Sequence, residues 1–328
     1  MLRNPVAVIM ICFGGLIIAC QSPEKQAGIP VVGFVEAFED ATIAQARQGF
    51  TDALADSGYS EADGSVAIIH RNAQGDAATL NQIISYFNSK EVNLIGTSTT
   101  LATISAVQRS EGIPIFQTVT AMPSILGLIA ADGEAPDNLF GTGENLDYID
   151  TSFMLITEMV KPKGAQLTVG MIYNQSEPQS QEAYEKIAEL ADSVGTQLVA
   201  LPLNSSAEAQ LVVRSLLDKN IDAFFANPDN TVFAAFETIL KNCNDRGVPV
   251  FTSESGLVAR GAVAAFGADI YHWGYQSGAQ AAAYLTSGST EGLQVEMLHV
   301  RKRVYHAEAA KRFGFTFPAT FEKIKPQE

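Results

Sequence analysis

The chain has 328 residues, of which 47% are hydrophobic and 17% charged, and its formal net charge is −15. This composition is typical of a folded protein rather than a disordered one, and the length is sufficient for two domains. Proteins that bind nucleic acid need basic patches, and none is visible. The composition therefore excludes nucleic acid as the main partner.

The N-terminus has the pattern of a secretory signal peptide. Arg3 supplies a short basic flank, an apolar run extends from Val6 to Ala19, and Cys20 follows directly. The run is shorter than the roughly 20 apolar residues of a membrane-spanning helix. A cysteine directly after a small residue resembles a bacterial lipobox, in which the thiol is acylated and becomes the first mature residue. The alternative is an ordinary signal peptide that happens to contain a cysteine.

We therefore expect a signal peptide at residues 1–19 and a lipid on Cys20. The polar segment that follows predicts a tether over residues 20–28. The protein is then expected on the extracytoplasmic, periplasmic side of the cell membrane, held there by its lipid.

The other cysteines and histidines form no recognisable site. Processing would leave Cys20 and Cys243, and a lipid on Cys20 would leave Cys243 without a disulfide partner. The four His residues are scattered, without the spacing of metal ligands. No Gly-x-Ser-x-Gly elbow, zinc motif or phosphate-binding Gly-rich loop occurs, so we expect no catalysis, no metal and no cofactor.

From Ile29 onward, short apolar segments alternate with segments of helical periodicity. Strands are predicted in the first half at 31–35, 66–69, 92–96 and 113–116. Strands are predicted in the second half at 168–173, 197–201, 221–226, 248–252 and 262–266. Continuous apolar strands between helices indicate parallel sheets covered on both faces. We predict an α/β protein with two doubly wound parallel-sheet lobes and a hinge.

A segment rich in Gly, Pro, Asn and Asp, from Met122 to Asp147, separates the two halves. We assign residues 29–146 and 268–290 to the first lobe, and residues 147–267 and 291–328 to the second. Open parallel sheets bind ligands outside the carboxyl ends of their strands. Two such sheets that face each other are expected to form a cleft, as in hinge-closing binding proteins.

Several segments, in order and spacing, resemble the bacterial ABC transporter substrate-binding protein family that includes tryptophan- and tyrosine-binding lipoproteins. They are VGFVE at 32–36, NAQGD at 72–76, TSTT at 97–100, PIFQTVT at 114–120, IYNQSE at 172–177, PDNTV at 228–232, PVFTSE at 249–254 and RGAVAAFG at 260–267. The resemblance implies a periplasmic-binding protein type I fold with three crossover strands. It also implies an exported monomer without catalysis, with an ABC permease and its ATPase as partners.

Two positions depart from the family pattern. The chain has Ala37-Phe38 where the family usually has a His-Pro-like pair, and Met122-Pro123 where it usually has Asp-Pro. Both segments are expected to approach the cleft. The ligand can therefore differ from that of the aromatic amino-acid members.

Polar residues follow the strands of the first half. An amino-acid zwitterion needs donors for its carboxylate, an acceptor for its ammonium and an apolar wall. Ser98, Thr99 and Thr100 open a helix whose first amides lack intrahelical partners, which suits a carboxylate. The alternative is simple capping of this helix by Ser98 or Thr99. Thr120 is expected to add a donor from the same side.

The second half offers polar strand ends as well. Asn174 and Ser176 follow one strand, and Asp229 and Asn230 follow another. Asp229 is a candidate partner for the ammonium group, with capping of the next helix as the alternative. Glu254 is the other candidate, and the sequence leaves the choice open.

Three residues complete the predicted site. Phe38 follows the first strand and is a candidate cover for the ligand side chain. Asn72 and Gln74 follow the second strand, where they either bind ligand or shape a turn. We predict a solute-binding lipoprotein of an ABC importer that closes on an amino acid. The alternative is a sensor module that presents its ligand to a membrane receptor kinase.

Overall fold

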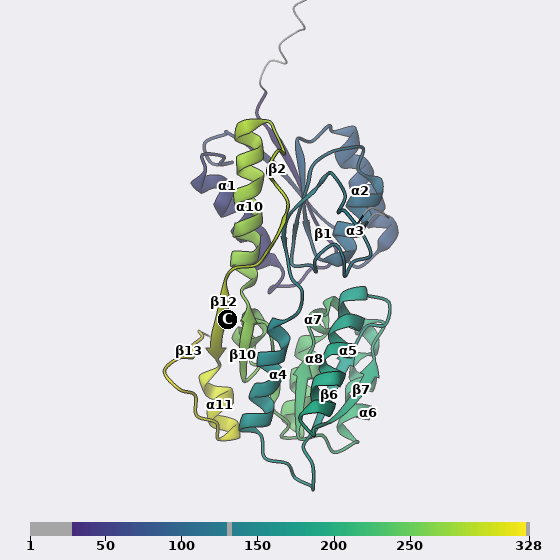
Figure 1. Cartoon of the computed structure of the whole chain (residues 1–328), viewed down its shortest axis with the longest axis vertical. Helices are drawn as coiled ribbons and strands as arrows, with labels where there is room; N and C mark the ends of the chain where they lie inside the picture. The colour runs from purple at the N-terminus through teal and green to yellow at the C-terminus, as the bar shows by residue number, and fades with distance from the viewer. Residues whose placement is uncertain (1–27, 130–132, 326–328) are drawn as a thin grey trace, which may run out of the picture.

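The computed structural model describes residues 28–129 and 133–325, which form two lobes joined by three chain crossings (Figure 1). The predicted signal peptide, Cys20 and most of the predicted tether lie outside the described residues. Among the helices that the model describes, none combines the length and apolar character needed to span a membrane.

The first lobe is built on a six-stranded sheet in the order β11-β5-β4-β3-β1-β2, with all neighbours parallel. Its strands are β1 (Val31–Glu36), β2 (Ala67–Asn72), β3 (Leu94–Ser98), β4 (Ile115–Thr118), β5 (Leu139–Gly143) and β11 (Val295–Met297). Its helices are α1 (Ala44–Asp56), α2 (Ala77–Ser89), α3 (Thr100–Arg109) and α10 (Ile270–Ser287). Helices α1 and α10 cover one face, and α2 and α3 cover the other (Figure 1).

The alternation of side chains along β1 explains this layering. Phe34 packs in the cluster under α1 and α10, whereas Val35 packs in the cluster under α2 and α3, and both are fully buried. A strand buried on both faces cannot carry the polar side that a one-sided sheet shows. The continuous apolar run that the sequence displays here is the consequence.

Helices α1 and α10 approach each other unusually closely because glycines line their contact. A Cβ atom on Gly274 would lie 1.8 Å from the carbonyl oxygen of Ala46, and one on Gly49 would lie 2.0 Å from that of Tyr271. No larger residue fits without moving the backbone. Helix α10 begins directly after the chain crosses from the second lobe. Its tight contact with α1 therefore fixes the end of that crossing to the first lobe.

The second lobe has a parallel four-stranded sheet in the order β7-β6-β8-β9, next to a sheet in the order β10-β12-β13. The strands are β6 (Thr168–Tyr173), β7 (Gln197–Pro202), β8 (Ala223–Ala226), β9 (Val250–Thr252), β10 (Ala264–Ala268), β12 (Arg301–Tyr305) and β13 (Glu322–Lys323). The helices are α4 (Tyr148–Met159), α5 (Pro178–Ser193), the 3-10 turn η1 (Ser206–Glu208), α6 (Ala209–Leu217), α7 (Asn230–Ala234), α8 (Phe236–Asp245), α9 (Ser255–Ala259) and α11 (Ala307–Phe313).

This arrangement confirms the predicted α/β class with two lobes built on parallel sheets. The second lobe adds one feature that the sequence pattern did not indicate. Strand β12 runs antiparallel to β10, because the chain enters it from the first lobe. Strand β10 in turn joins the edge of the parallel sheet through a bridge between Glu254 and Ala268.

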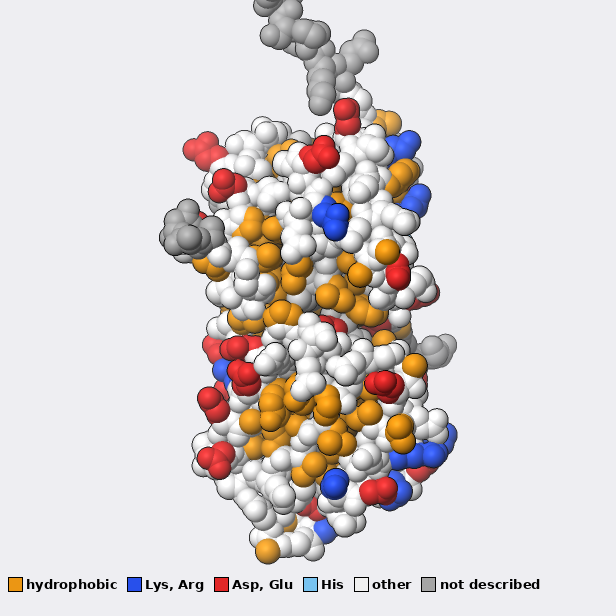
Figure 2. Space-filling view, turned by 90° about the vertical axis from the view of Figure 1, so that its right-hand side faces the viewer, with side chains coloured by type: hydrophobic (Ala, Val, Ile, Leu, Met, Phe, Trp, Pro, Cys, Tyr) orange, Lys and Arg blue, Asp and Glu red, His pale blue; other side chains and the backbone are white. Residues whose placement is uncertain are grey.

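The three crossings lie between β5 and α4, between β10 and α10, and between β11 and β12. The predicted second lobe resumes at residue 291, but β11 pairs with β5, so residues 295–297 extend the sheet of the first lobe. The third crossing therefore falls at residues 298–300. On the face in Figure 2, the lobes meet without a wide gap, and apolar side chains gather on both.

Candidate ligand-binding site

A pocket lies between the lobes, where strands of both sheets end. The lining residues come from both lobes and from the hinge; they are Val119, Tyr148, Gln179, Pro228, Asp229, Asn230, Phe233, Glu254, Ile270 and Trp273. Three aromatic side chains and four polar side chains therefore share one small space. This composition is typical of a pocket for a small amphipathic molecule.

The two lobes touch beside this pocket. The hydroxyl of Thr100 donates to Oε1 of Gln179 at 3.0 Å, and it lies 3.1 Å from the hydroxyl of Thr120. Gln179 belongs to the second lobe, so the start of α3 faces across the cleft. The predicted site residues Thr100 and Thr120 thus lie at the contact between the lobes, and both are buried.

Ser98 and Thr99 hold hydroxyls that the described residues leave unpaired. Both side chains are fully buried, and neither hydroxyl has a hydrogen-bond partner within the described part of the chain. Thr99 occupies the N-cap position of α3 without a capping bond from its side chain. The capping alternative is therefore not what Thr99 does in this structure.

The backbone of Thr99 is strained as well. Its φ of 82° and ψ of 160° fall in a region that residues other than glycine rarely adopt. Such a conformation costs on the order of 1–3 kcal/mol and persists mainly at functional positions. Together with the unbonded amides of the first turn of α3, the two hydroxyls form a set of donors suited to an anionic group.

Both carboxylate oxygens of Asp229 accept hydrogen bonds, and one of them caps helix α7. Its Oδ1 accepts from the amides of Thr231 at 2.7 Å and Val232 at 2.9 Å. Its Oδ2 accepts from the amide of Asn174 at 2.8 Å and from the hydroxyl of Ser180. Burial raises the pKa of Asp229 although these donors oppose the shift. The contacts of Asp229 match the capping alternative, and they leave little capacity for a ligand.

Glu254 differs because one of its oxygens is free. Its Oε1 accepts from the hydroxyls of Tyr148 at 2.9 Å and Ser253 at 3.2 Å. Its Oε2 is buried and has no partner among the described residues. The residue is 1% exposed, and burial raises the pKa of its carboxyl to about 8. Of the two carboxylates that the sequence left open, only Glu254 keeps an unused acceptor on the pocket.

Glu177 is a buried carboxylate that the sequence analysis did not select. It accepts from Nδ2 of Asn230 at 2.8 Å and from Nδ2 of Asn174 at 3.2 Å. Burial, together with the nearby charge of Asp229, raises the pKa of Glu177 to about 8. Asn174 and Asn230 are therefore held by Glu177 rather than left free. The hydroxyls and amides around it satisfy this carboxylate without a cation.

A second crevice between the lobes contains another group of the predicted residues. Phe38 and Gln74 from the first lobe line it together with Asn174 and Ser176 from the second. Asn72 does not reach either space. Its Oδ1 accepts from the amide of Gln74 at 2.8 Å, which is the turn-shaping alternative. Of the predicted residues, Asp229, Asn230 and Glu254 therefore line the inner pocket, and Phe38, Gln74, Asn174 and Ser176 line this outer crevice. The others line neither; they are Asn72, Ser98, Thr99, Thr100 and Thr120.

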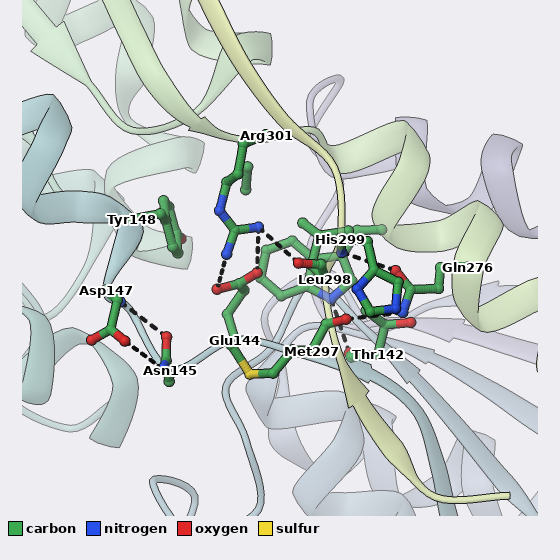
Figure 3. Close-up of polar contacts among 12 residues, drawn as sticks. Thr142, Glu144, Asn145, Asp147, Tyr148, Gln276, Met297, Leu298, His299 and Arg301 are labelled. Atoms are coloured by element: carbon green, nitrogen blue, oxygen red, sulfur yellow. Dashed lines mark hydrogen bonds and ion pairs between the residues drawn. The ribbon is translucent and has the colours of Figure 1, made fainter.

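The hinge supports two walls of the inner pocket (Figure 3). Arg301 binds the buried carboxylate of Glu144 through two contacts, of 2.7 and 2.8 Å, and its guanidinium lies 5.1 Å from the ring centre of Tyr148. Trp273 donates from Nε1 to the carbonyl oxygen of Thr142 at 2.9 Å. Burial raises the pKa of Glu144 to about 7, although Arg301 opposes the shift. Contacts with Arg301 and Thr142 therefore hold the side chains of Tyr148 and Trp273 in place.

Tyr148 and Trp273 were not selected from the sequence. A signal was present for Trp273, since it is the single Trp of the chain and follows a strand by a few residues. Tyr148 directly follows the segment from Met122 to Asp147, in which the sequence pattern indicates only loops and a crossing.

Comparison with known proteins now decides the family. A model described as ABC transporter substrate binding protein matches residues 29–325. The chain belongs to this family. A curated relative, the tyrosine-binding protein of Clostridioides difficile strain R20291, is 29% identical over 280 residues, which cover 85% of this chain and 79% of the relative.

Solved structures agree with the substrate-binding protein family. A conserved domain protein from Vibrio cholerae has a TM-score of 0.80 at 27% identity, with 89% of this chain and 97% of that chain covered. An ABC domain from Streptococcus pneumonia in complex with L-Trp has a TM-score of 0.79 at 20% identity, with coverage of 89% and 97%. A ligand-free, open substrate-binding protein with adhesive properties from Clostridium difficile has a TM-score of 0.66 at 26% identity, with coverage of 91% and 100%.

These findings confirm the predicted family and its two-lobed, periplasmic-binding protein type I fold. Members of this ABC transporter family bind solutes outside the cytoplasm and are not enzymes, so the expectation of a non-catalytic binding protein is confirmed too. Within residues 28–129 and 133–325, no group of three or more His, Cys, Asp or Glu is placed to hold a metal ion.

Proposed function

We propose that this substrate-binding protein closes around an aromatic L-amino acid in the inner pocket and delivers it to an ABC importer. The observation that carries the proposal is unused hydrogen-bonding capacity in and beside this pocket. Glu254 lines the pocket with a free, buried carboxylate oxygen. The unpaired hydroxyls of Ser98 and Thr99 are buried next to Thr100, which contacts Gln179 of the pocket lining. Buried polar groups without partners are rare in folded proteins, and a ligand is a physical reason to keep them.

Glu254 is the proposed partner of the ligand ammonium. A carboxylate and an ammonium form a charge-assisted hydrogen bond, which is strong where water is excluded. The free Oε2 of Glu254 is available for this bond, and Oε1 is held in place by Tyr148. Because a neighbouring cation favours the charged form of a carboxyl group, binding of the ligand ammonium would ionise Glu254.

The start of α3 is the proposed site of the ligand carboxylate. The hydroxyls of Ser98 and Thr99 and the first amides of this helix are donors, and the helix dipole adds partial positive charge. The strained backbone of Thr99 is consistent with a residue held in place for this purpose.

The aromatic wall favours a ring-bearing ligand side chain. Tyr148, Phe233 and Trp273 line the pocket, and a ring packs on them with a large apolar contact. The curated relative is named a tyrosine-binding protein, which supports the same class of ligand. L-Tyrosine and L-tryptophan are therefore the first candidates.

Closure of the hinge is the proposed mechanism. The whole-chain likeness is greater to the L-Trp complex, at a TM-score of 0.79, than to the open, ligand-free protein, at 0.66. The L-Trp complex has the lower sequence identity, 20% against 26% for the open protein, so sequence similarity does not explain its higher TM-score. We attribute the difference in TM-score to the arrangement of the lobes. A ligand that contacts both Glu254 and α3 would stabilise only the closed arrangement.

The delivery step completes the proposal. A lipid on Cys20 would tether a monomer to the extracytoplasmic face of the membrane, beside an ABC permease and its ATPase. The family supports the ABC part of this assignment. Metabolic labelling with a palmitate analogue tests the lipid, since label in the wild type that disappears in Cys20→Ser is the expected result. Equal labelling of both would contradict it.

The ligand is tested by two measurements on the purified protein. Mass spectrometry of the denatured protein identifies any co-purified solute, and isothermal titration compares L-tyrosine, L-tryptophan, L-leucine and myo-inositol. We expect an aromatic L-amino acid to bind with a dissociation constant of roughly micromolar or below. Binding of inositol without binding of any amino acid would refute the proposal.

A further inference from the structure

Arg260 makes an ion pair between the lobes, away from the inner pocket. It lies at the end of α9 in the second lobe, and its Nη1 reaches Oδ2 of Asp40 at 2.7 Å and the hydroxyl of Thr42 at 3.1 Å. Asp40 and Thr42 belong to the first lobe, between β1 and α1. Both members of the pair are buried, with 9% of the Arg260 side chain and 3% of the Asp40 side chain exposed.

We propose that Asp40, Thr42, Ile43 and Arg260 form a latch that holds the lobes closed and thereby sets how long the ligand stays bound. None of the four lines the inner pocket. They are therefore positioning residues, which act on the ligand only through the position of the lobes. The inference rests on the proposed closure of the hinge.

The guanidinium of Arg260 is already oriented by the second lobe. Glu237 accepts from its Nε and Nη2, both at 2.8 Å, and the carbonyl oxygen of Phe233 accepts from Nη2 at 3.1 Å. The planar group also lies 5.0 Å from the ring centre of Phe236. An arginine held in this way loses little side-chain freedom when it meets a carboxylate.

The carboxylate of Asp40 is oriented by the first lobe in the same manner. Its Oδ1 accepts from the amides of Thr42 at 2.8 Å and Ile43 at 3.0 Å, just before α1 begins. Oδ2 remains for Arg260. Both partners of the pair are therefore set by their own lobes, and the contact between them requires only that the lobes meet.

An apolar contact accompanies the ion pair. Ile43 of the first lobe is fully buried within the apolar cluster of the second lobe, which includes Phe233, Leu257 and Val258. A Cβ atom on Gly256 would lie 2.2 Å from Cγ2 of Thr42, so the two backbones approach closely. Separation of the lobes would expose Ile43 to water.

The latch also borders the inner pocket. The carbonyl oxygen of Phe233 accepts a hydrogen bond from Arg260, and the side chain of Phe233 packs in the same apolar cluster as Ile43 and lines the inner pocket. Contacts that exist only in the closed form raise its population, and the apparent affinity rises with that population. Weakening the latch should therefore speed ligand release without altering any ligand contact.

The first test measures the dissociation rate of L-tyrosine by stopped-flow fluorescence of Trp273, the single Trp of the chain and a wall of the pocket. We expect Asp40→Asn and Ile43→Ala each to raise the rate roughly tenfold. The matched control is Arg246→Gln, which removes an exposed ion pair to Asp218 inside the second lobe and should leave the rate unchanged. Unchanged rates in both latch variants, with melting temperatures near the wild type, would overturn the latch.

A second test does not depend on the ligand. X-ray scattering in the absence of ligand compares the wild type with the double variant Asp40→Asn/Ile43→Ala. The double variant should have the larger radius of gyration, because it lacks both the ion pair and the apolar contact that hold the lobes together. Equal radii would overturn the latch even if L-tyrosine proves not to bind. Failure of the wild type to bind any amino acid, with a difference in radius, would refute the proposed function alone.

Discussion

Both lobes bury polar side chains at the cleft, but the two lobes differ in how many of these groups have hydrogen-bond partners. On the first lobe, the hydroxyls of Ser98 and Thr99 are buried and unpaired among the described residues. On the second lobe, Asp229 and Glu177 are just as buried, but neighbouring amides and hydroxyls satisfy them. Glu254 alone among these three acids keeps a free oxygen. We therefore propose that the three residues with unused bonding capacity, Ser98, Thr99 and Glu254, contact the ligand, and that the satisfied acids do not.

We expect the largest effect on ligand affinity from a matched pair of substitutions at two of these acids, Glu254 and Asp229. Glu254→Gln removes the proposed partner of the ammonium and should lower the affinity for L-tyrosine roughly a hundredfold. Asp229→Asn disturbs a satisfied cap and should lower the melting temperature, with a smaller loss of affinity in the folded protein. Calorimetric titration and thermal unfolding of both variants give the answer. A greater affinity loss in Asp229→Asn at an unchanged melting temperature would reverse the assignment.

The first-lobe edge should respond in a different way. Thr99→Gly removes an unpaired hydroxyl and relieves the backbone strain, so stability should rise by about 1 kcal/mol while affinity falls roughly tenfold. Thr97→Val is the control, because the Thr97 hydroxyl lies 2.8 Å from that of Thr103 in a bonded pair. This control should lose stability and keep its affinity. If Thr99→Gly bound as tightly as the wild type, the start of α3 would not hold the ligand carboxylate.

A smaller expected effect is the release of a proton from Glu254 when the ligand binds. Burial raises the pKa of Glu254 to about 8, so the ligand-free carboxyl is mostly protonated at pH 7. Binding of an ammonium favours ionisation and should release close to one proton at pH 7. Affinity should therefore rise about fivefold between pH 7 and 8, and only about twofold more above pH 8.

Titration in buffers of different ionisation enthalpy measures this proton release. Glu254→Gln serves as the control and should release far less. Proton release that persists unchanged in Glu254→Gln would assign the effect to another group, with Glu144 as the nearest candidate because burial raises its pKa to about 7.

Much of the fold could be predicted from the sequence because its signals are local. The run from Val31 to Val35 predicts a strand buried on both faces, and β1 is such a strand. Alternation of such runs with helical segments predicts two parallel sheets. The antiparallel β12 could not be predicted, since its direction follows from the path of the chain between the lobes.

The site was predicted less completely because its chemistry depends on distant contacts. The bonding of Asp229 is set by Asn174 and Ser180, which lie 55 and 49 residues away. Oε1 of Glu254 is bound by Tyr148, which is 106 residues away, whereas Oε2 is left free among the described residues. Arg260 reaches Asp40 across 220 residues. A strand end rich in polar residues shows where a site lies, but the contacts decide which residue has capacity left.

The most direct test of the account pairs a change in the protein with a change in the ligand. Titrations compare L-tyrosine with 3-(4-hydroxyphenyl)propanoate, which lacks the ammonium group, in the wild type and in Glu254→Gln. We predict that loss of the ammonium weakens binding to the wild type roughly a hundredfold but weakens binding to Glu254→Gln only about threefold or less. An equal loss in both proteins would show that Glu254 does not hold the ligand ammonium.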